Sequence, residues 1–241
     1  MGPESSLPGR AGGGPRADRV KKFIVVAGNI GVGKSTLVGL LSAKLGWQPF
    51  YESVAENPYL ADFYSDMPRW SFQSQMFFLA NRLASHRQLL DHPTSVVQDR
   101  SVYEDAEIFA RNLYDQGYLA ERDFTTYCHL YDVLVELLPP PDLVVYLRAS
   151  VSTLQQRIAK RGRDYESRIR PLYLAQLNAL YEHWIERFNL CPTLTVPADA
   201  LDYVANSSHL ELVVSKVREK LQGKEEVLFS REEVQQVNGQ A

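Results

Sequence analysis

Five short runs of apolar residues, well separated along the chain, form the main pattern of this sequence. They lie at residues 23–27, 48–51, 95–98, 143–147 and 194–196. An uninterrupted apolar run of this length is typical of a strand that is buried on both faces of a sheet. We therefore expect five buried strands.

The segments between these runs are longer and have the apolar spacing of helices. We expect helices at residues 35–45, 70–90, 102–114, 122–137, 152–160 and 171–188. Strands that alternate with helices form a parallel sheet covered by helices on both faces. The sequence therefore predicts an α/β fold, in which ligands bind at the carboxyl ends of the strands.

Composition narrows the class of protein. The chain has 241 residues, of which 45% are hydrophobic, with 26 Lys and Arg against 29 Asp and Glu and a net charge of −3. Two cysteines, Cys128 and Cys191, cannot form a disulfide scaffold for a chain of this length. No apolar run approaches the roughly 20 residues that span a bilayer. We expect a cytoplasmic protein that binds neither a membrane nor, by bulk charge, a nucleic-acid polymer.

The two ends of the chain differ from its middle. Residues 1–19 are rich in Gly, Pro, Ser and Arg and lack apolar spacing, which predicts a flexible N-terminal tail. Residues 223–241 are mostly polar and predict a short peripheral segment. A single domain is expected over residues 20–222.

A phosphate-binding loop follows the first apolar run. Its residues are Gly28-Asn29-Ile30-Gly31-Val32-Gly33-Lys34-Ser35-Thr36, which fit the pattern Gly-x-x-x-x-Gly-Lys-Ser. The glycines let backbone amides surround phosphates, Lys34 neutralises the β and γ oxygens, and the Ser35 hydroxyl ligates Mg²⁺. The loop lies between an apolar run and a helical pattern, as the motif requires, so we expect binding of ATP or GTP with Mg²⁺.

Charged residues follow the third and second apolar runs. Asp99 lies where a strand ends and suits Mg²⁺ or its waters, and the adjacent Arg100 suits a phosphoryl group in transfer. Glu52 follows the second run. A carboxylate there accepts the proton of an alcohol, whereas a phosphate acceptor is best held by cations, so Glu52 favours an alcohol acceptor.

Residues 157–170 form a basic stretch with six cations and two carboxylates, a local charge of +4. Arg157 and Arg161 are four positions apart on the expected helix, and Gly162 permits a turn that brings Arg163 back near them. This pattern indicates a lid that closes over a triphosphate and supplies positive charge. A solvated, charged helix face has the same pattern.

With these motifs assembled, the chain resembles the deoxynucleoside kinases, the family that includes deoxycytidine, deoxyguanosine and mitochondrial thymidine kinases. The likeness runs from about residue 22 to residue 221 and rests on motifs in the family's order. These motifs are the phosphate loop, Glu52, Arg69-Trp70-Ser71-Phe72 with Gln75, Asp99-Arg100-Ser101-Val102-Tyr103, and the lid from Arg157 to Glu166.

The resemblance implies a P-loop kinase fold with a five-stranded parallel sheet, a homodimer, and transfer of the γ-phosphate of ATP to the 5′-hydroxyl of a deoxynucleoside. Glu52 would accept the hydroxyl proton, with Asp99 as the alternative base and the residue that organises Mg²⁺. Lys34 and Arg100 would complete the catalytic set. The phosphate loop would hold ATP together with three lid residues, Arg157, Arg161 and Arg163.

The resemblance also implies a set of residues for the deoxynucleoside. Tyr64 and Glu166 match positions that hold the sugar 3′-hydroxyl, Gln75 matches a residue that pairs with the base edge, and Phe109 matches an aromatic that stacks on the base. Helical spacing supports two further pairs independently. Gln75 and Arg82 are seven positions apart, and Asp105 and Phe109 are four apart, so each pair shares a helix face. A structural salt bridge between Arg82 and Asp105 remains the alternative.

Base choice depends on positions where family members differ. Members that accept cytosine or purine bases carry Arg and Asp at the positions of Arg82 and Asp105, which disfavours thymidine. Asn57, Ser74 and Asp99 stand where the animal enzymes usually have Trp, Phe and Glu. These residues resemble the bacterial branch, so we expect a purine deoxynucleoside, deoxyadenosine or deoxyguanosine.

Three alternatives stay open. Deoxycytidine could be the main substrate. A nucleoside monophosphate kinase of the thymidylate kinase type shares the phosphate loop and an arginine lid, and would accept a nucleotide. A non-catalytic regulatory module would use the loop as a switch, which would leave Glu52, Gln75 and Glu166 without a purpose.

Overall fold

A five-stranded parallel sheet lies at the centre of the computed structural model, which describes residues 21–51, 57–225 and 227–239. The strand order is β2-β3-β1-β4-β5, and every neighbouring pair is parallel. The strands are β1 (Phe23–Gly28), β2 (Gln48–Phe50), β3 (Val96–Asp99), β4 (Leu143–Arg148) and β5 (Thr193–Pro197). The expected α/β fold is confirmed.

The central strands are buried on both faces, but the outer two are not. Every residue of β1 and β3 is buried, as is β4 up to its last residue. In contrast, β2 has no buried residue and β5 alternates between buried and half-buried positions. The expectation of five doubly buried strands is therefore wrong for β2 and β5. Both lie at an edge of the sheet, where a strand has a neighbour on one side only.

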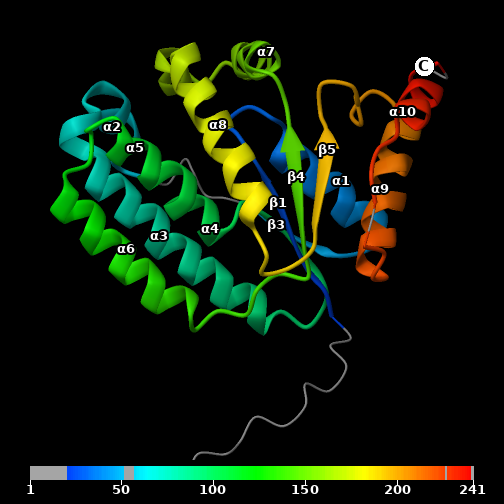
Figure 1. Cartoon of the computed structure of the whole chain (residues 1–241), viewed down its shortest axis with the longest axis horizontal. Helices are drawn as coiled ribbons and strands as arrows, with labels where there is room; N and C mark the ends of the chain where they lie inside the picture. The colour runs from blue at the N-terminus through cyan, green and yellow to red at the C-terminus, as the bar shows by residue number, and fades with distance from the viewer. Residues whose placement is uncertain (1–20, 52–56, 226, 240–241) are drawn as a thin grey trace, which may run out of the picture.

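Helices cover both faces of the sheet (Figure 1). Alternate residues of β1 face opposite sides: Ile24 and Val26 pack in one core with α1 and α9, and Val25 and Ala27 pack in the other with α3, α6 and α8. The long helices are α1 (Lys34–Leu45), α3 (Met67–Asp91), α6 (Glu121–Val135), α7 (Val151–Arg161), α8 (Pro171–Arg187) and α9 (Ser207–Leu221). Both faces of the sheet are thus closed to water.

Several helical segments differ from the expected ones. The pattern at 102–114 is divided into α4 (Val102–Glu104), the π-helical turn η2 (Asp105–Ala110) and α5 (Arg111–Asp115). Three helices had not been expected: α2 (Leu60–Ser65), α9, and α10 (Arg231–Asn238). Lys216 on α9 pairs with Glu233 on α10 at 2.6 Å. Among the described residues, no helix is both long enough and apolar enough to cross a membrane.

Candidate active site

The loop after β1 has backbone angles that favour glycine. Gly28 and Gly31 have φ values of 144° and 82°. A Cβ atom at Gly31 would lie 2.6 Å from Ile158 Cγ1 of α7, and one at Gly28 would lie 2.9 Å from the carbonyl oxygen of Leu147 on β4. The loop is therefore packed tightly between the end of β4 and helix α7.

Lys34, the first residue of α1, folds back over this loop. Its Nζ donates hydrogen bonds to the carbonyl oxygens of Gly28 at 2.9 Å and Asn29 at 3.1 Å, and the residue is buried. The Asn29 side chain is itself fixed, because its amide donates to the carbonyl oxygen of Leu174 on α8 at 2.9 Å. The ammonium group thus lies where the motif requires a cation.

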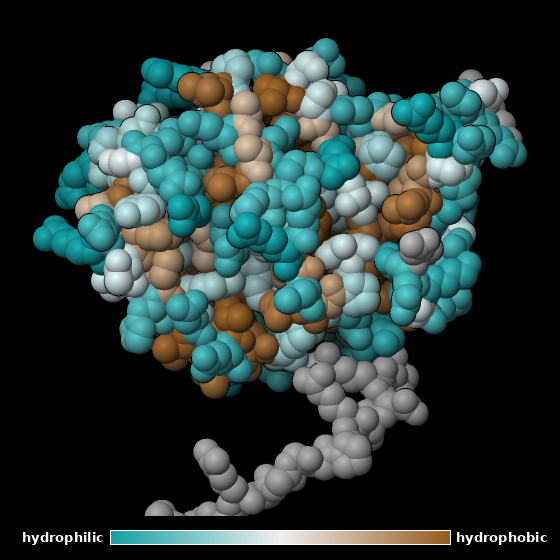
Figure 2. All heavy atoms as spheres, viewed as in Figure 1, coloured by the Kyte–Doolittle hydropathy of each residue, from teal (hydrophilic) through white to brown (hydrophobic). Residues whose placement is uncertain are grey.

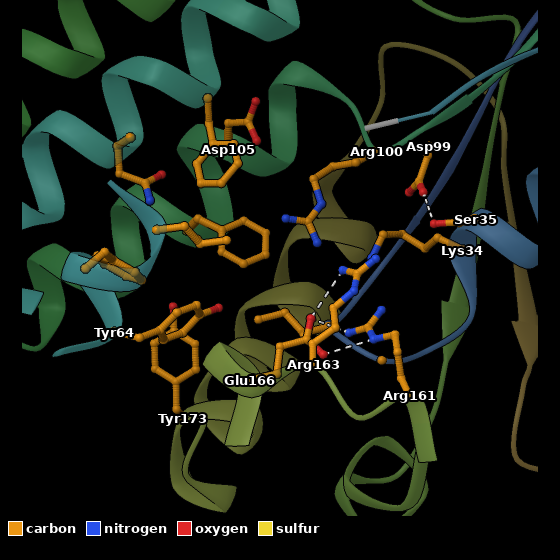
Figure 3. A pocket seen from close by; sticks show the side chains of 17 residues that line it. Lys34, Ser35, Tyr64, Asp99, Arg100, Asp105, Arg161, Arg163, Glu166 and Tyr173 are labelled. Carbon is orange, nitrogen blue, oxygen red and sulfur yellow. Dashed lines mark hydrogen bonds and ion pairs between the residues drawn. The ribbon is translucent and has the colours of Figure 1, made fainter. Parts of the chain in front are cut away.

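The end of β3 places a carboxylate against the phosphate loop. Asp99 is buried, and its Oδ2 accepts a hydrogen bond from Ser35 Oγ (Figure 3). Within the described part of the chain, Asp99 Oδ1 has no hydrogen-bond partner. Mg²⁺ usually takes one or two protein oxygens and completes its shell with waters and substrate phosphates. Asp99 and Ser35 fit that ion.

Arg100 follows Asp99 with a left-handed backbone, the one such non-glycine residue among those described, at φ 65°. Its guanidinium carbon lies 4.1 Å from the centre of the Phe109 ring, and its Nε lies 4.0 Å from Glu104 Oε1. The side chain extends into a cavity at the carboxyl ends of the strands (Figure 3). The strained backbone therefore directs a cation toward the cavity.

This acceptor cavity encloses about 100 Å³ beside the phosphate loop. Most of the expected site residues line it: Lys34, Ser35, Tyr64, Gln75, Asp99, Arg100, Asp105, Phe109, Arg161, Arg163 and Glu166. The structure thus brings together residues from the phosphate loop, the end of the third apolar run, the second and third expected helices, and the basic stretch.

Four aromatic or apolar lining residues were not expected from the sequence. Leu60 and Phe63 belong to α2, which is too short to show a clear helical period. Phe78 lies on α3, and Tyr173 lies on α8 directly after the basic stretch. Burial raises the pKa of Tyr173 to about 12, so its hydroxyl keeps its proton at neutral pH. Only its position after the lid could have indicated Tyr173.

Arg82 and Asp105 form a buried ion pair at the back of the acceptor cavity. Arg82 Nε and Nη2 donate to the two Asp105 carboxylate oxygens at 3.0 and 3.3 Å, and Nη1 donates to the carbonyl oxygen of Asp99 at 3.2 Å. Of the two residues, Asp105 lines the cavity and Arg82 reaches it from behind. The salt bridge that stood as the alternative is therefore present, and Arg82 does not line the cavity, so its role in substrate binding stays a prediction.

The basic stretch includes the end of α7 and the short 3₁₀ turn η3 (Asp164–Arg168). Helix α7 ends at Gly162 with φ 67°, the turn expected there. The buried Glu166 carboxylate accepts hydrogen bonds from Arg161 at 2.6 and 2.9 Å and from Arg163 at 3.4 Å (Figure 3). Both lid arginines therefore point toward the cavity and share one carboxylate.

A larger cleft of about 720 Å³, the donor cleft, lies on the other side of the lid arginines. Arg157 lines it and donates to the carbonyl oxygens of Val32 at 2.6 Å and Ala198 at 2.8 Å. The acceptor cavity and the donor cleft share Gly31, Lys34, Ser35, Arg161 and Arg163. A group bound in one space can therefore meet a group bound in the other beside these cations.

One expected site residue cannot be placed. Glu52 lies outside the described residues, so its position relative to Arg100 stays a prediction. In the described part of the chain, no group of three or more His, Cys, Asp and Glu side chains could hold a metal by itself. A magnesium ion bound mainly through substrate phosphates does not require such a group.

Comparisons with known proteins identify the family. The family model described as deoxynucleoside kinase matches residues 24–222. The chain belongs to the deoxynucleoside kinase family. It is a phosphotransferase with an alcohol group as acceptor, which confirms the expected reaction class. The family thus favours this reaction over a nucleotide acceptor and over a non-catalytic module.

The kinase is similar to bacterial proteins that are named for different deoxynucleosides. It is 38% identical over 197 residues to the deoxyadenosine/deoxycytidine kinase of Bacillus subtilis strain 168. This match covers 81% of this chain and 91% of that protein. It is 36% identical over 201 residues to the deoxyguanosine kinase of the same strain, at 82% and 96% coverage. A solved structure is also similar, that of the deoxyadenosine kinase from M. mycoides with the products dCMP and dCDP. The sequence identity is 34% and the TM-score is 0.74, and the match covers 82% of this chain and 99% of that one.

Proposed function

We propose that this kinase transfers the γ-phosphate of ATP, with Mg²⁺, to the 5′-hydroxyl of a purine deoxynucleoside in nucleotide salvage. The arrangement of the two binding spaces is the observation that carries the proposal. Lys34, Ser35 and the two lid arginines line both the acceptor cavity and the donor cleft. A nucleoside in the first and ATP in the second would meet at the phosphate loop.

The proposed reaction depends on positioning and on positive charge, as phosphoryl transfer generally does. Lys34 and the lid arginines would neutralise the transferred group, and Arg100 would bind near the attacking oxygen. Asp99 and Ser35 would hold Mg²⁺, which would neutralise negative charge on the phosphates. Glu52 as the base, with Asp99 as its alternative, stays a prediction. Tyr64 and Glu166, which line the acceptor cavity, would hold the sugar 3′-hydroxyl.

Hydrogen-bond acceptor atoms around the cavity support a base that carries an amino group. Gln75 is buried, and its Oε1 has no hydrogen-bond partner among the described residues. Asp105 adds a carboxylate to the same cavity. Adenine and cytosine present an amino donor where thymine presents a carbonyl acceptor. These two side chains therefore favour deoxyadenosine or deoxycytidine over thymidine. Phe109, which lines the same cavity, would stack on the base.

The residues at positions 57 and 74 support the purine over the pyrimidine. Asn57 and Ser74 are both buried, and the Asn57 amide donates to Ser74 Oγ at 3.1 Å. Two small polar side chains thus stand where the animal enzymes usually have a Trp and a Phe. Smaller side chains at these positions would leave more room for a two-ring base, so deoxyadenosine is our first candidate. Deoxyguanosine follows it, and deoxycytidine is the alternative.

Phosphorylation of a substrate panel tests this proposal. Initial rates with ATP and Mg²⁺ are measured for deoxyadenosine, deoxyguanosine, deoxycytidine, thymidine and the purine monophosphates. We expect the highest kcat/KM for a purine deoxynucleoside, the lowest for thymidine and no phosphorylation of monophosphates. The variant Lys34→Ala serves as the control for contaminating kinases, because it removes the cation of the phosphate loop. A preference for thymidine would refute the reading of the base pocket.

We also propose that two copies of the chain associate through α6 and the turn that follows it. Leu130, Val133 and Leu137 are 37%, 49% and 75% exposed and recur at helical spacing, so they share a face. Hydrophobic side chains are visible near the C-terminal end of α6, at the lower left of Figure 2. Light scattering should give a dimer for the native chain and a monomer for Val133→Glu. The cytoplasmic location stays a prediction.

A further inference from the structure

Glu104 is a fully buried carboxylate that the reaction described above does not use. It is 0% exposed and is the last residue of α4, which follows the end of β3 directly. It lines neither the acceptor cavity nor the donor cleft. A charged group in this position loses its hydration, so its contacts must compensate for a considerable cost.

The first contacts of Glu104 fix the backbone directly after Arg100. Glu104 Oε2 accepts hydrogen bonds from Ser101 N at 2.8 Å and from Ser101 Oγ at 3.2 Å. On the other side, Arg100 N donates to the carbonyl oxygen of Val26 on β1 at 3.0 Å. A left-handed residue with a side chain costs about 1–2 kcal/mol. Glu104 therefore holds the peptide that follows the strained residue.

A second contact of Glu104 acts on the Arg100 side chain. Glu104 Oε1 lies 4.0 Å from Arg100 Nε, while the Phe109 ring lies 4.1 Å from the guanidinium carbon. The guanidinium is thus close to both a carboxylate and an aromatic face, and 11% of the Arg100 side chain is exposed. The position of the cation that faces the acceptor cavity is restricted by Glu104.

The remaining contacts of Glu104 reach the phosphate loop and α8. Glu104 Oε1 accepts from Gly28 N at 3.2 Å and from the Tyr181 hydroxyl at 2.8 Å. The same hydroxyl lies 2.8 Å from the carbonyl oxygen of Gly28, to which Lys34 Nζ also donates. Since a hydroxyl has one proton, Tyr181 can donate to one of these oxygens at a time. The carboxylate is therefore bonded directly to the first residue of the loop.

The electrostatic environment of Glu104 agrees with this arrangement. Burial raises the pKa of Glu104, whereas the positive charges of Arg100 and Lys34 and the hydrogen bonds from Ser101 and Tyr181 oppose that rise. Both of these cations line the acceptor cavity. Glu104 thus interacts with both without reaching the substrate spaces.

We propose that Glu104 is a positioning residue for phosphoryl transfer, because it holds the Arg100 guanidinium and the first residue of the phosphate loop at one fixed separation. Arg100 faces the acceptor cavity and the loop faces the donor cleft, so this separation sets the distance between the two substrates. Rates of transfer between bound groups are sensitive to displacements of about 1 Å. The role does not depend on which base is accepted, and therefore stands apart from the proposed purine preference.

The variant Glu104→Gln tests the proposal. A glutamine keeps the volume but has one oxygen, so the amide of either Gly28 or Ser101 loses its acceptor, and the charge facing Arg100 disappears. We expect kcat with the best nucleoside substrate to fall about tenfold to hundredfold, while the KM for ATP changes less than about threefold. The matched control is Glu107→Gln, an exposed carboxylate one turn further along, which should leave kcat unchanged. A folded Glu104→Gln protein with unchanged kcat would overturn the proposal.

A double-mutant cycle separates positioning from a merely structural role. If Glu104 acts through Arg100, the loss of kcat caused by Glu104→Gln should be much smaller in an Arg100→Lys background than in the native protein. An equal loss in both backgrounds would overturn the proposal. If Glu104→Gln does not fold, the same cycle is run with Glu104→Asp, which keeps the charge but withdraws it by one methylene. The same two results then decide.

Discussion

The buried pair of Arg82 and Asp105 allows a quantitative test of how the acceptor cavity is built. Replacing Arg82 by methionine keeps an unbranched side chain but removes the guanidinium. The substitution removes both bonds to the Asp105 carboxylate, at 3.0 and 3.3 Å, and the bond to the carbonyl oxygen of Asp99. The Asp105 side chain is only 3% exposed, so its carboxylate would lose both Arg82 bonds at a place that water hardly reaches.

The expected size of the effect follows from this burial. Removing one partner of a buried ion pair costs about 3–5 kcal/mol of folding stability, because the other charge stays uncompensated. For a domain of this size, that loss corresponds to a fall in Tm of about 6–20 °C. Replacing both residues, Arg82→Met with Asp105→Ala, removes the stranded charge. The double variant should therefore be more stable than the single one.

Urea unfolding followed by circular dichroism measures these free energies. Arg87→Met is the matched control, because Arg87 lies on the same helix but is exposed, and should change stability by at most about 0.5 kcal/mol. A loss below about 1 kcal/mol for Arg82→Met, the range of an exposed pair, would refute the reasoning from burial. So would a double variant no more stable than Arg82→Met alone. The double variant should also raise the relative activity toward thymidine, since the carboxylate that opposes its carbonyl is gone.

Three further predictions follow from other contacts. Arg157→Met removes the bonds from α7 to the carbonyls of the phosphate loop and of the turn after β5, so the KM for ATP should rise about tenfold in steady-state assays, with a smaller change for the nucleoside. Backbone amides of Ala205 and Val204 lower the pKa of Asp202 in the folded protein. The Asp202 carboxylate therefore stabilises the fold at pH values above its ordinary pKa of 3.8, and this stabilisation is lost as the pH falls through the pKa of the folded state. Asp202→Asn should thus lower Tm at pH 7, and the difference should vanish in acid. Burial raises the pKa of Cys191 to about 12, so its alkylation, followed by mass spectrometry, should keep accelerating between pH 10 and pH 11, where an ordinary thiol has levelled off.

The order of strands and helices could be predicted because each central strand is apolar over its whole length. β1 and β4 show the uninterrupted runs that burial on both faces requires. The pattern could not reveal which strands lie at the edges, since the strand order depends on contacts between distant segments. It also missed α2, which has six residues, and α9, whose apolar positions are mixed with charged ones. A helix of six residues is too short to show an apolar period, whereas Leu210, Val213, Val214 and Val217 of α9 have helical spacing that could have indicated it.

The parts of the site that are made of consecutive residues could be predicted from the sequence. The phosphate loop and the pair of Asp99 and Arg100 are of this kind, and the structure brings them to one cavity. Glu104 lies four positions after Arg100, and its sequence context resembles an ordinary helix cap. Its role depends on Gly28 and Tyr181, which are 76 and 77 positions away. Contacts of that range leave no local pattern, so no reading of spacing could have found them.

The charges at the junction of the two substrate spaces explain how a chain with a net charge of −3 can hold a triphosphate. Two of the hydrogen bonds of Lys34 go to neutral carbonyl oxygens, which a phosphate with full negative charge can displace. Arg161 and Arg163 are held by the Glu166 carboxylate, whose full charge competes with phosphate far better than a carbonyl does. In the proposed reaction, Glu166 also binds the sugar hydroxyl of the acceptor. A bound nucleoside would then weaken the ion pairs between Glu166 and the lid arginines. The arginines would become available to the phosphates, so the positive charge of the lid would act on ATP only when the acceptor is in place.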